Sequence, residues 1–157
     1  MTRTARTLTQ QAVVGHGRDA FRSAVDGLMT WQMHRRAGVR TEPAGRTGAI
    51  GRAEPGLRVA VGIGPRRLAL GGVCVVERVD SDGERVSLTY RTEAGHVEDG
   101  VQTFDVVLMP DGEVRGRITS TSTPAHRLLR ALPGLGAAGQ RVVARRYLRA
   151  LRRLAAS

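Results

Sequence analysis

The sequence predicts an α+β fold in which a long C-terminal helix covers a curved antiparallel sheet of six or seven strands. Three observations indicate this class. Apolar residues follow a helical period near the N-terminus, the period changes to two between Val39 and Thr123, and the helical period returns after Pro124. Because the period-two segments follow one another through short turns, they favour an antiparallel meander over alternating strands and helices.

The N-terminal helix is expected over residues 18–36. Phe21, Val25 and Leu28 repeat at helical spacing and mark one apolar face. Gly38 lies just beyond the last turn, where a glycine commonly ends a helix. Residues 1–10 precede a short predicted strand and are expected to be flexible.

The strands of the sheet are predicted from alternating segments that are rich in valine and threonine. The turn Pro110-Asp111-Gly112 indicates a hairpin, because proline presets the turn dihedral and glycine accepts a positive φ. Glycines inside the strands, such as Gly72 and Gly116, are compatible with bends that curve the sheet. The predicted strands cover residues 12–14, 57–63, 68–79, 85–92, 104–109 and 114–123, with a glycine-rich loop at 44–55.

The C-terminal part is expected to be helical. A short helix is predicted over residues 125–132, Pro133-Gly134 breaks it, and a long helix follows from Ala138 to Ala155. This long helix is amphipathic, so its apolar stripe is the natural cover for one face of the sheet. The stripe contains Val143, Tyr147, Leu151 and Leu154, whereas another face carries Arg141, Arg145, Arg149 and Arg152.

Length and composition favour one soluble domain over residues 1–157. A chain of 157 residues with 41% hydrophobic residues can bury a core of its own. The single cysteine, Cys74, lies in an apolar run and cannot form an internal disulfide bond, which is typical of a reducing compartment. No apolar stretch indicates a secretory signal or a membrane span, so the expected location is cytoplasmic.

The formal net charge of +11 is unevenly distributed along the chain. All 25 basic residues are arginine, and residues 121–157 contain eight of them but no acidic residue. Such a segment can bind an anionic membrane surface or the phosphates of nucleic acid. The chain lacks interleaved aromatic residues and known DNA-binding patterns, which argues against nucleic acid as the partner.

The motifs that would indicate a metal, a cofactor or a nucleophile are not present. The four histidines show no metal-binding spacing with each other or with Cys74, and no nucleophile elbow occurs. The glycines of residues 134–139 match a dinucleotide-binding pattern, but no strand precedes them and no acidic residue follows Glu113. We therefore expect no metal and no cofactor.

The segment from Tyr90 to Gly100 is the most unusual part of the sequence, since it is longer and more polar than a tight hairpin requires. If the strand resumes by Val97, His96 and Glu98 project to the same face and can form an acid/base pair. An exposed turn with a local hydrogen bond is the alternative interpretation. Trp31 and His34, near the end of the first predicted helix, form a second candidate pair.

With these residues in view, the chain resembles the domain of unknown function nineteen-ninety family, whose members occur in actinobacteria and plants. The resemblance covers about residues 12–152. It rests on Val14-Gly15, Gly17, Phe21, Ala24, the segment from Trp31 to Val39, Tyr90, Thr92, Gly95-His96, Glu98, Gly100, Phe104 and the segment from Arg146 to Leu151. The family is similar to the START-like, helix-grip superfamily, which implies an apolar ligand enclosed between the sheet and the C-terminal helix. Plant relatives have been associated with the chloroplast outer envelope, which implies a membrane-linked alternative.

Three hypotheses about function follow. The first is a small binding module for an apolar or amphipathic molecule, with polar contacts from Tyr90, Thr92, His96 and Glu98 and further ligand contacts from Trp31, His34 and Phe104. The second is a cyclase- or hydrolase-like enzyme in which His96 and Glu98 transfer protons. The third is a binder of anionic surfaces through Arg141, Arg145, Arg149 and Arg152. The sequence leaves open the ligand, any reaction and the oligomeric state.

Overall fold

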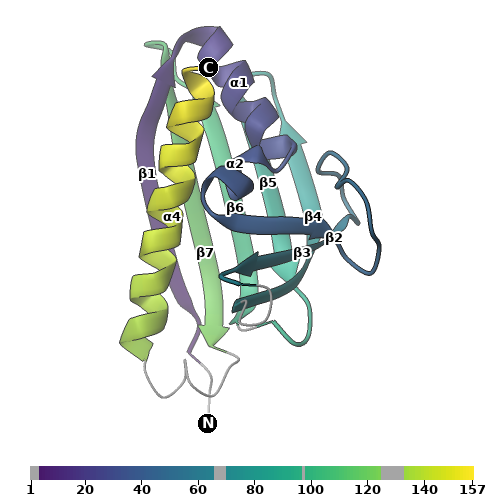
Figure 1. Ribbon diagram of the computed structural model, residues 1–157. Helices are drawn as coiled ribbons and strands as arrows, with labels where there is room; N and C mark the ends of the chain where they lie inside the picture. The colour runs from purple at the N-terminus through teal and green to yellow at the C-terminus, as the bar shows by residue number, and fades with distance from the viewer. Residues whose placement is uncertain (1–3, 66–69, 97, 125–132) are drawn as a thin grey trace.

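The computed structural model describes residues 4–65, 70–96, 98–124 and 133–157, and consists of one sheet with helices on one of its faces (Figure 1). Its elements, in chain order, are β1 (Arg6–His16), α1 (Gly17–Met29), α2 (Gln32–Arg36), β2 (Val39–Pro43), β3 (Arg58–Ile63), β4 (Leu70–Ser81), β5 (Arg85–Thr92), β6 (Glu98–Leu108), β7 (Glu113–Pro124) and α4 (Pro133–Ala155). The short helix expected at 125–132 lies outside the described residues.

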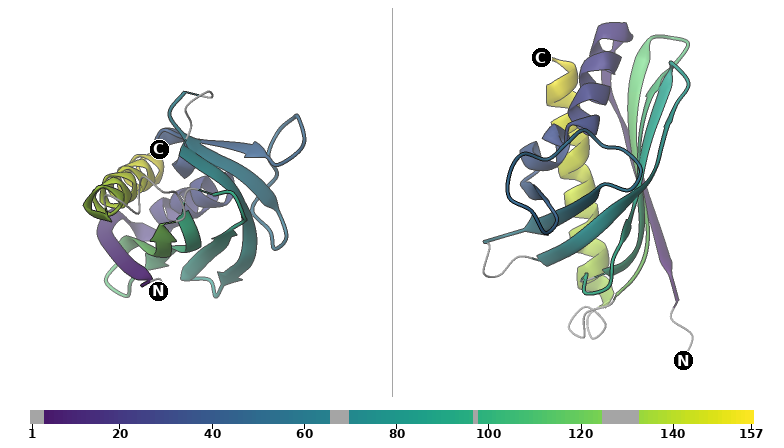
Figure 2. Two further views of the ribbon diagram at one scale, coloured as in Figure 1. Left: turned by 90° about the horizontal axis from the view of Figure 1, so that it is seen from below. Right: turned by 90° about the vertical axis from the view of Figure 1, so that its right-hand side faces the viewer.

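The sheet has seven antiparallel strands in the order β1-β7-β6-β5-β4-β3-β2. Strands β2 to β7 form a meander, and β1 completes the sheet by pairing with β7. The sheet curves around the helices, so that α1, α2 and α4 occupy its concave side (Figure 2). The predicted α+β class, with a curved antiparallel sheet covered by a C-terminal helix, is confirmed.

The predicted N-terminal helix is interrupted. Thr30 and Trp31 separate α1 from α2, and Trp31 adopts the left-handed conformation with φ of 65°. The Thr30 hydroxyl group donates to the Asp26 carbonyl at 2.7 Å, and the backbone N–H of Thr30 donates to the same oxygen at 2.9 Å. The period of the apolar residues continues through the break, which explains why the sequence pattern does not reveal it.

Several elements are longer than the sequence predicts, and β6 is one of them, since it begins at Glu98 instead of residue 104. Strand β1 begins at Arg6 and therefore includes residues 6–10, for which we expected a flexible segment, because these residues pair with β7 in continuous register. Helix α4 begins at Pro133 instead of Ala138. Proline is well accommodated in the first turn of a helix, where its missing N–H has no partner to lose.

The residues at which the sheet is irregular differ from those that allow α4 to pack closely against it. The register shifts of the sheet lie between Val13 and Gly15 and between Val76 and Arg78, and not at Gly72 or Gly116. A Cβ atom at Gly116 would lie 3.0 Å from the Leu151 side chain of α4. This glycine therefore allows the helix to approach β7 closely, instead of bending the strand.

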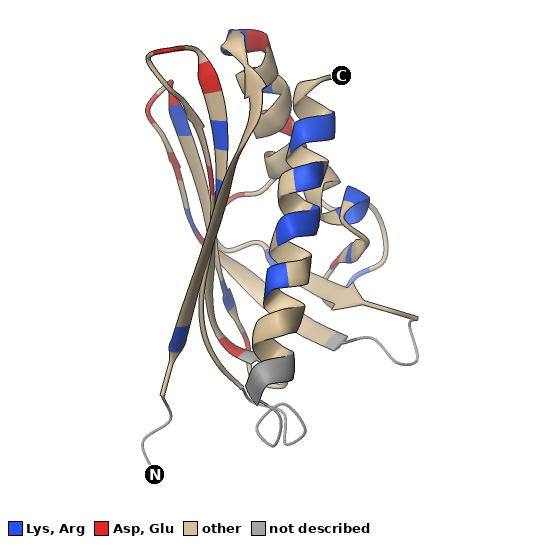
Figure 3. Ribbon diagram, turned by 90° about the vertical axis from the view of Figure 1, so that its left-hand side faces the viewer, with Lys and Arg blue, Asp and Glu red and all other residues tan. Residues whose placement is uncertain are grey.

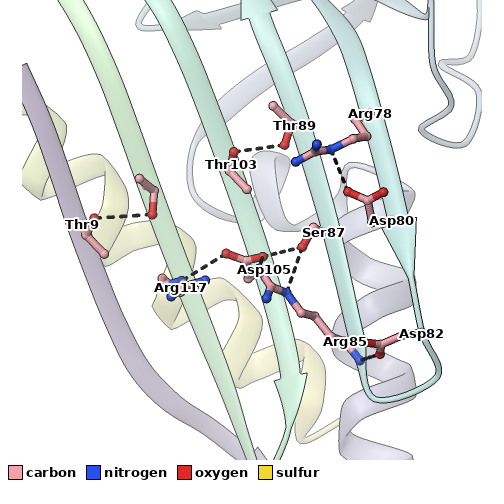
Figure 4. A network of polar contacts seen from close by, with 11 residues as sticks. Thr9, Arg78, Asp80, Asp82, Arg85, Ser87, Thr89, Thr103, Asp105 and Arg117 are labelled. Atoms are coloured by element: carbon pink, nitrogen blue, oxygen red, sulfur yellow. Dashed lines mark hydrogen bonds and ion pairs between the residues drawn. The ribbon is translucent and has the colours of Figure 1, made fainter. Parts of the chain in front are cut away.

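The outer face of the sheet is polar, and its carboxylates pair with arginines of the same face (Figure 4). The Asp105 carboxylate is 2% exposed, and it accepts hydrogen bonds from Ser87, from Arg85 at 2.8 Å and from Arg117 at 3.1 Å. Burial by itself raises the pKa of the Asp105 carboxyl group, but these hydrogen bonds outweigh it and the pKa is lowered. The carboxylate is therefore a stabilising part of the fold at neutral pH.

Replacing Asp105 by asparagine is expected to lower the free energy of unfolding by about 2 kcal/mol at pH 7, because charge-assisted hydrogen bonds are lost. Since the folded-state pKa is lowered, the contribution of Asp105 is present above the ordinary aspartate pKa of about 4 and is lost as the pH falls below it. Urea unfolding at pH 7 and pH 3 measures this, with Asp80→Asn as the exposed control. Equal losses in the two variants at pH 7 would contradict the interpretation.

Candidate functional site

The interior between the sheet and the helices is centred on a buried histidine. His34 is 0% exposed, and α2 holds it against four aromatic rings. Its ring centroid lies 5.0 Å from Phe104, 5.1 Å from Trp31 and Tyr147, and 6.0 Å from Tyr90. Two of these residues come from the sheet, one from the break between α1 and α2, and one from α4.

The break between α1 and α2 brings Trp31 into this cluster. The indole N–H donates to the Gly51 carbonyl oxygen at 2.9 Å, and Trp31 is fully buried. The N–H of Ala53 donates to the Met29 carbonyl oxygen at 2.8 Å, which fixes the same loop to the end of α1. A left-handed non-glycine residue costs free energy, so these contacts must hold the backbone of Trp31 in place.

A row of hydrogen-bonded polar side chains crosses the inner face of the sheet. Tyr90, Gln102 and Ser120 lie directly opposite one another on β5, β6 and β7, and we call them the polar row. The Tyr90 hydroxyl group donates to Gln102 Oε1 at 2.8 Å, and Gln102 Nε2 donates to Ser120 Oγ at 2.9 Å. Tyr147 of α4 packs next to this row, with its ring centroid 5.1 Å from that of His34 and 5.3 Å from that of Phe104.

The inner face beyond the polar row consists of short or polar side chains. The backbone N–H of Gly100 donates to Thr92 Oγ1 at 2.9 Å, and Ser122 lies opposite Gly100. Gln140 of α4 donates to Ser122 Oγ at 2.7 Å and accepts from the Arg6 guanidinium group at 3.2 Å. On the other side of the polar row the inner face is apolar, with Leu88, Phe104, Val106 and Ile118 buried. The interior is therefore amphipathic.

The hydrogen bonds define the protonation state of His34. Burial, and then the charge of Arg35, lower the pKa of the His34 imidazole to about 3, so it is neutral at physiological pH. Tyr90 already donates its proton to Gln102, so the 3.5 Å contact between Tyr90 and His34 requires Nε2 to carry the hydrogen. His34 Nδ1 is then a buried acceptor, and it has no hydrogen-bond partner among the described residues.

The buried phenol and thiol groups are also held neutral. Burial raises the pKa of Tyr90 and Tyr147 well above the ordinary value for tyrosine, and it raises the pKa of the Cys74 thiol to about 12. Cys74 is 1% exposed, as expected of a small buried apolar residue. Neutral hydroxyl and imidazole groups can exchange hydrogen bonds with a neutral polar group, but they supply no charge.

The structure gathers four of the predicted site residues and places the others elsewhere. Trp31, His34, Tyr90 and Phe104 form the aromatic cluster, and Thr92 lies at the end of β5 beyond the polar row.

His96 belongs to the turn before β6 and packs on Gly72, where a Cβ atom would lie 2.9 Å from the imidazole Cδ2. Gly72 alternates with the buried residues Cys74 and Val76, so His96 lies over the inner face of β4. Strand β6 is described from Glu98, and residue 97, at which the predicted pairing of His96 with Glu98 placed the start of the strand, lies outside the described residues. The side chain of Glu98 lies outside the described part, so the predicted acid/base pair stays a prediction.

Sequence reasoning missed the residues of the polar row other than Tyr90. Gln102 and Ser120 share the period-two face of Phe104 and Ile118, and this alternation is the signal that could have identified them. Tyr147 was predicted as part of an apolar stripe, and only the packing of α4 shows that its ring contacts His34 and Phe104. Gln140 and Arg6 are distant from the row in sequence and carry no such signal.

Neither a metal-binding group nor a membrane-spanning helix is found among the described residues. Within these residues no group of three histidine, cysteine, aspartate or glutamate side chains could hold a metal ion. None of the described helices is long and apolar enough to cross a membrane. The predicted anion-binding residues Arg141, Arg145, Arg149 and Arg152 are exposed on α4.

Comparison with known proteins gives a family and a fold. The model of a family described as "Domain of unknown function (DUF1990)" matches residues 2–150. No curated protein matches the sequence.

Three solved structures illustrate the likeness in fold. The hypothetical protein jhp0584 from Helicobacter pylori has a TM-score of 0.61 at 12% identity, with 91% of this chain and 86% of that chain covered. Ara h 8.0201 has a TM-score of 0.61 at 12% identity over 98% and 99% of the two chains. A truncated norcoclaurine synthase from Thalictrum flavum has a TM-score of 0.59 at 11% identity over 94% and 93%. At these identities the likeness shows the fold alone.

Proposed function

Because the chain belongs to the DUF1990 family of unknown function and has a helix-grip fold, we propose that it is a small binding module that holds one apolar or amphipathic molecule between the sheet and α4. The polar row is the observation that carries this proposal. Replacing both partners of a buried hydrogen bond by apolar groups of the same shape can be nearly neutral or stabilising, so an apolar interior would stabilise the fold as well as the polar row does. The row therefore has a use other than stability.

The amphipathic interior supports a ligand with two different ends. The aromatic cluster around Trp31 and Phe104 offers an apolar wall, and the groups near Ser120 and Ser122 offer hydrogen-bond donors and acceptors. The interior groups are neutral, apart from Arg6 at its margin. A hydroxyl or carbonyl group is the polar end that this arrangement fits best. Thr92, His96 and Glu98 are proposed as additional contacts.

A related fold with a bound small molecule is consistent with this use. A point mutant of norcoclaurine synthase from Thalictrum flavum was solved in complex with a transition state analogue, and its chain superposes on this one with a TM-score of 0.54 at 12% identity. The likeness extends to the fold and not to the residues. The enzyme hypothesis, with His96 and Glu98 as acid and base, stays a prediction, because the side chain of Glu98 lies outside the described part of the chain.

Ligand binding is expected to change the fluorescence of Trp31, because this is the only tryptophan in the chain and it lies against Tyr90 and His34. We expect a saturable change with at least one member of a panel of long-chain alcohols, fatty acids, sterols and planar phenols. The double variant Gln102→Leu/Ser120→Ala is expected to weaken that binding about tenfold, since two hydrogen bonds are removed.

A matched control exists on the same strand. Thr103 lies on the outer face of β6, next to Gln102 in sequence, and its hydroxyl group contacts Thr89 at 3.0 Å. Thr103→Val is expected to leave the dissociation constant unchanged. The proposal fails if no member of the panel changes the fluorescence, or if the outer-face variant weakens binding as much as the inner-face variant.

A further inference from the structure

One exposed face of α4 carries a row of four arginines. Arg141, Arg145, Arg149 and Arg152 follow one another at spacings of four, four and three residues, so they lie on one side of the helix (Figure 3). At a rise of 1.5 Å per residue this arginine row is about 16 Å long. All four side chains are exposed.

The arginine row is not neutralised. No residue of the row forms an ion pair with the described part of the chain, and the sequence contains no acidic residue after Glu113. The arginines of the sheet behave differently, because Arg58 pairs with Glu93 at 2.6 Å and Arg85 pairs with Asp105 at 2.8 Å. The arginine row on α4 is therefore a concentration of positive charge, whereas Arg58 and Arg85 of the sheet are compensated by carboxylates.

A groove lies between the arginine row and β1. It has a volume of about 360 Å³. Its lining consists of Gln10, Gln11 and Ala12 from the strand and Arg145, Leu148, Arg149 and Arg152 from the helix. Strand β1 is an edge of the sheet, since it pairs only with β7. The groove thus places three arginines, which have no ion-pair partner among the described residues, beside the free edge of β1.

The backbone of β1 presents hydrogen-bonding groups along this edge. Arg152 donates to the Val13 carbonyl oxygen at 3.1 Å, so this carbonyl group points toward α4 and away from β7. The direction of the backbone groups alternates along a strand, and the register between β1 and β7 is continuous from Arg6 to Val13. The N–H and C=O groups of Gln11 and Thr9 therefore also point to the free edge.

We propose that this groove binds an extended acidic segment of a partner polypeptide, which adds to the free edge of β1 and pairs its carboxylates with Arg145 and Arg149. An added strand satisfies the N–H and C=O groups of the edge, which a lipid headgroup or a nucleic-acid phosphate does only in part. Side chains two residues apart on a strand lie about 6.7 Å apart, close to one turn of α4. The segment therefore carries acidic residues at alternate positions. A second copy of β1 contains no acidic residue and does not fit.

The test uses the whole protein and a fluorescent twelve-residue peptide of alternating glutamate and threonine with blocked ends. Fluorescence anisotropy at physiological ionic strength gives the dissociation constant. Arg145→Gln/Arg149→Gln is expected to raise it about tenfold, as two exposed ion pairs of about threefold each are lost. The control Arg35→Gln/Arg36→Gln removes the same charge from exposed residues of α2, outside the groove, and is expected to change it less than about twofold.

Amide hydrogen exchange distinguishes strand addition from simple charge attraction. The peptide is expected to slow the exchange of the Thr9 and Gln11 amides. Equal weakening in the two double variants would overturn the proposal. It would also be overturned if phosphatidylserine vesicles or a single-stranded oligonucleotide bound more tightly at the same arginines while the β1 amides stayed unprotected, because the surface would then recognise lipid or nucleic acid.

Discussion

Lowering the pH from 7.5 to 4.5 is expected to reduce the free energy of unfolding by about 3 kcal/mol through His34 alone. The folded-state pKa of His34 is lowered to about 3, whereas an unfolded histidine titrates near 6.5. Below pH 6.5 the unfolded state therefore binds the proton and the folded state does not. The loss is about 1.4 kcal/mol for each pH unit below 6.5, and it continues until the folded-state pKa is reached.

Urea unfolding of the wild type and of His34→Phe over this pH range isolates the effect. Phenylalanine is similar in shape and fits the surrounding aromatic rings, but it cannot titrate. The difference in free energy of unfolding between the two proteins should therefore shift by about 3 kcal/mol between pH 7.5 and pH 4.5. A pH-independent difference, or an imidazole resonance of His34 that titrates near pH 6.5, would show that the histidine is not enclosed.

Replacing Trp31 by alanine is expected to lower the free energy of unfolding by about 3–5 kcal/mol, the range for removing a large aromatic side chain from a core. The indole ring is 0% exposed, contacts His34 and Tyr90, and donates the hydrogen bond to Gly51. Without the ring, the left-handed backbone at residue 31 loses the contacts that hold it. Urea unfolding at neutral pH measures the loss.

Two controls separate the contributions of Trp31. Trp31→Phe keeps an aromatic ring but removes the hydrogen bond to Gly51, and it should cost about 1–2 kcal/mol. Val142→Ala removes an exposed side chain from α4 and should change the free energy of unfolding by less than about 0.5 kcal/mol. If Trp31→Ala costs no more than Val142→Ala, the break between α1 and α2 does not depend on the indole ring.

The sequence predicts the sheet better than the helices. The alternation from Arg85 to Thr92 matches β5, because a strand with one buried face has a strict period of two. The break at Trp31 could not be predicted, since the apolar period passes through it and the loop that holds the indole ring is 20 residues away in sequence. The pairing of residues 6–10 with β7 likewise depends on a partner more than 100 residues distant.

The candidate site was predicted in part. Trp31 and His34 were identified from their positions near a helix end, and Tyr90 from the unusual segment that it begins. Gln102 was not identified because it precedes the predicted strand 104–109, whereas β6 begins at Glu98. Ser120 was not identified, although it lies in the predicted strand 114–123, because a polar residue in a strand does not by itself indicate a site. Their role follows only from the register, which aligns them with Tyr90 across three strands.

Native mass spectrometry of the purified protein, before and after incubation with the panel of amphipathic molecules, tests the central claim most directly. We expect a complex with one small molecule per chain, and we expect Gln102→Leu/Ser120→Ala to retain less of that molecule than the wild type. The mass of the bare chain alone, both before and after incubation with every member of the panel, would contradict the claim that the interior is a binding site.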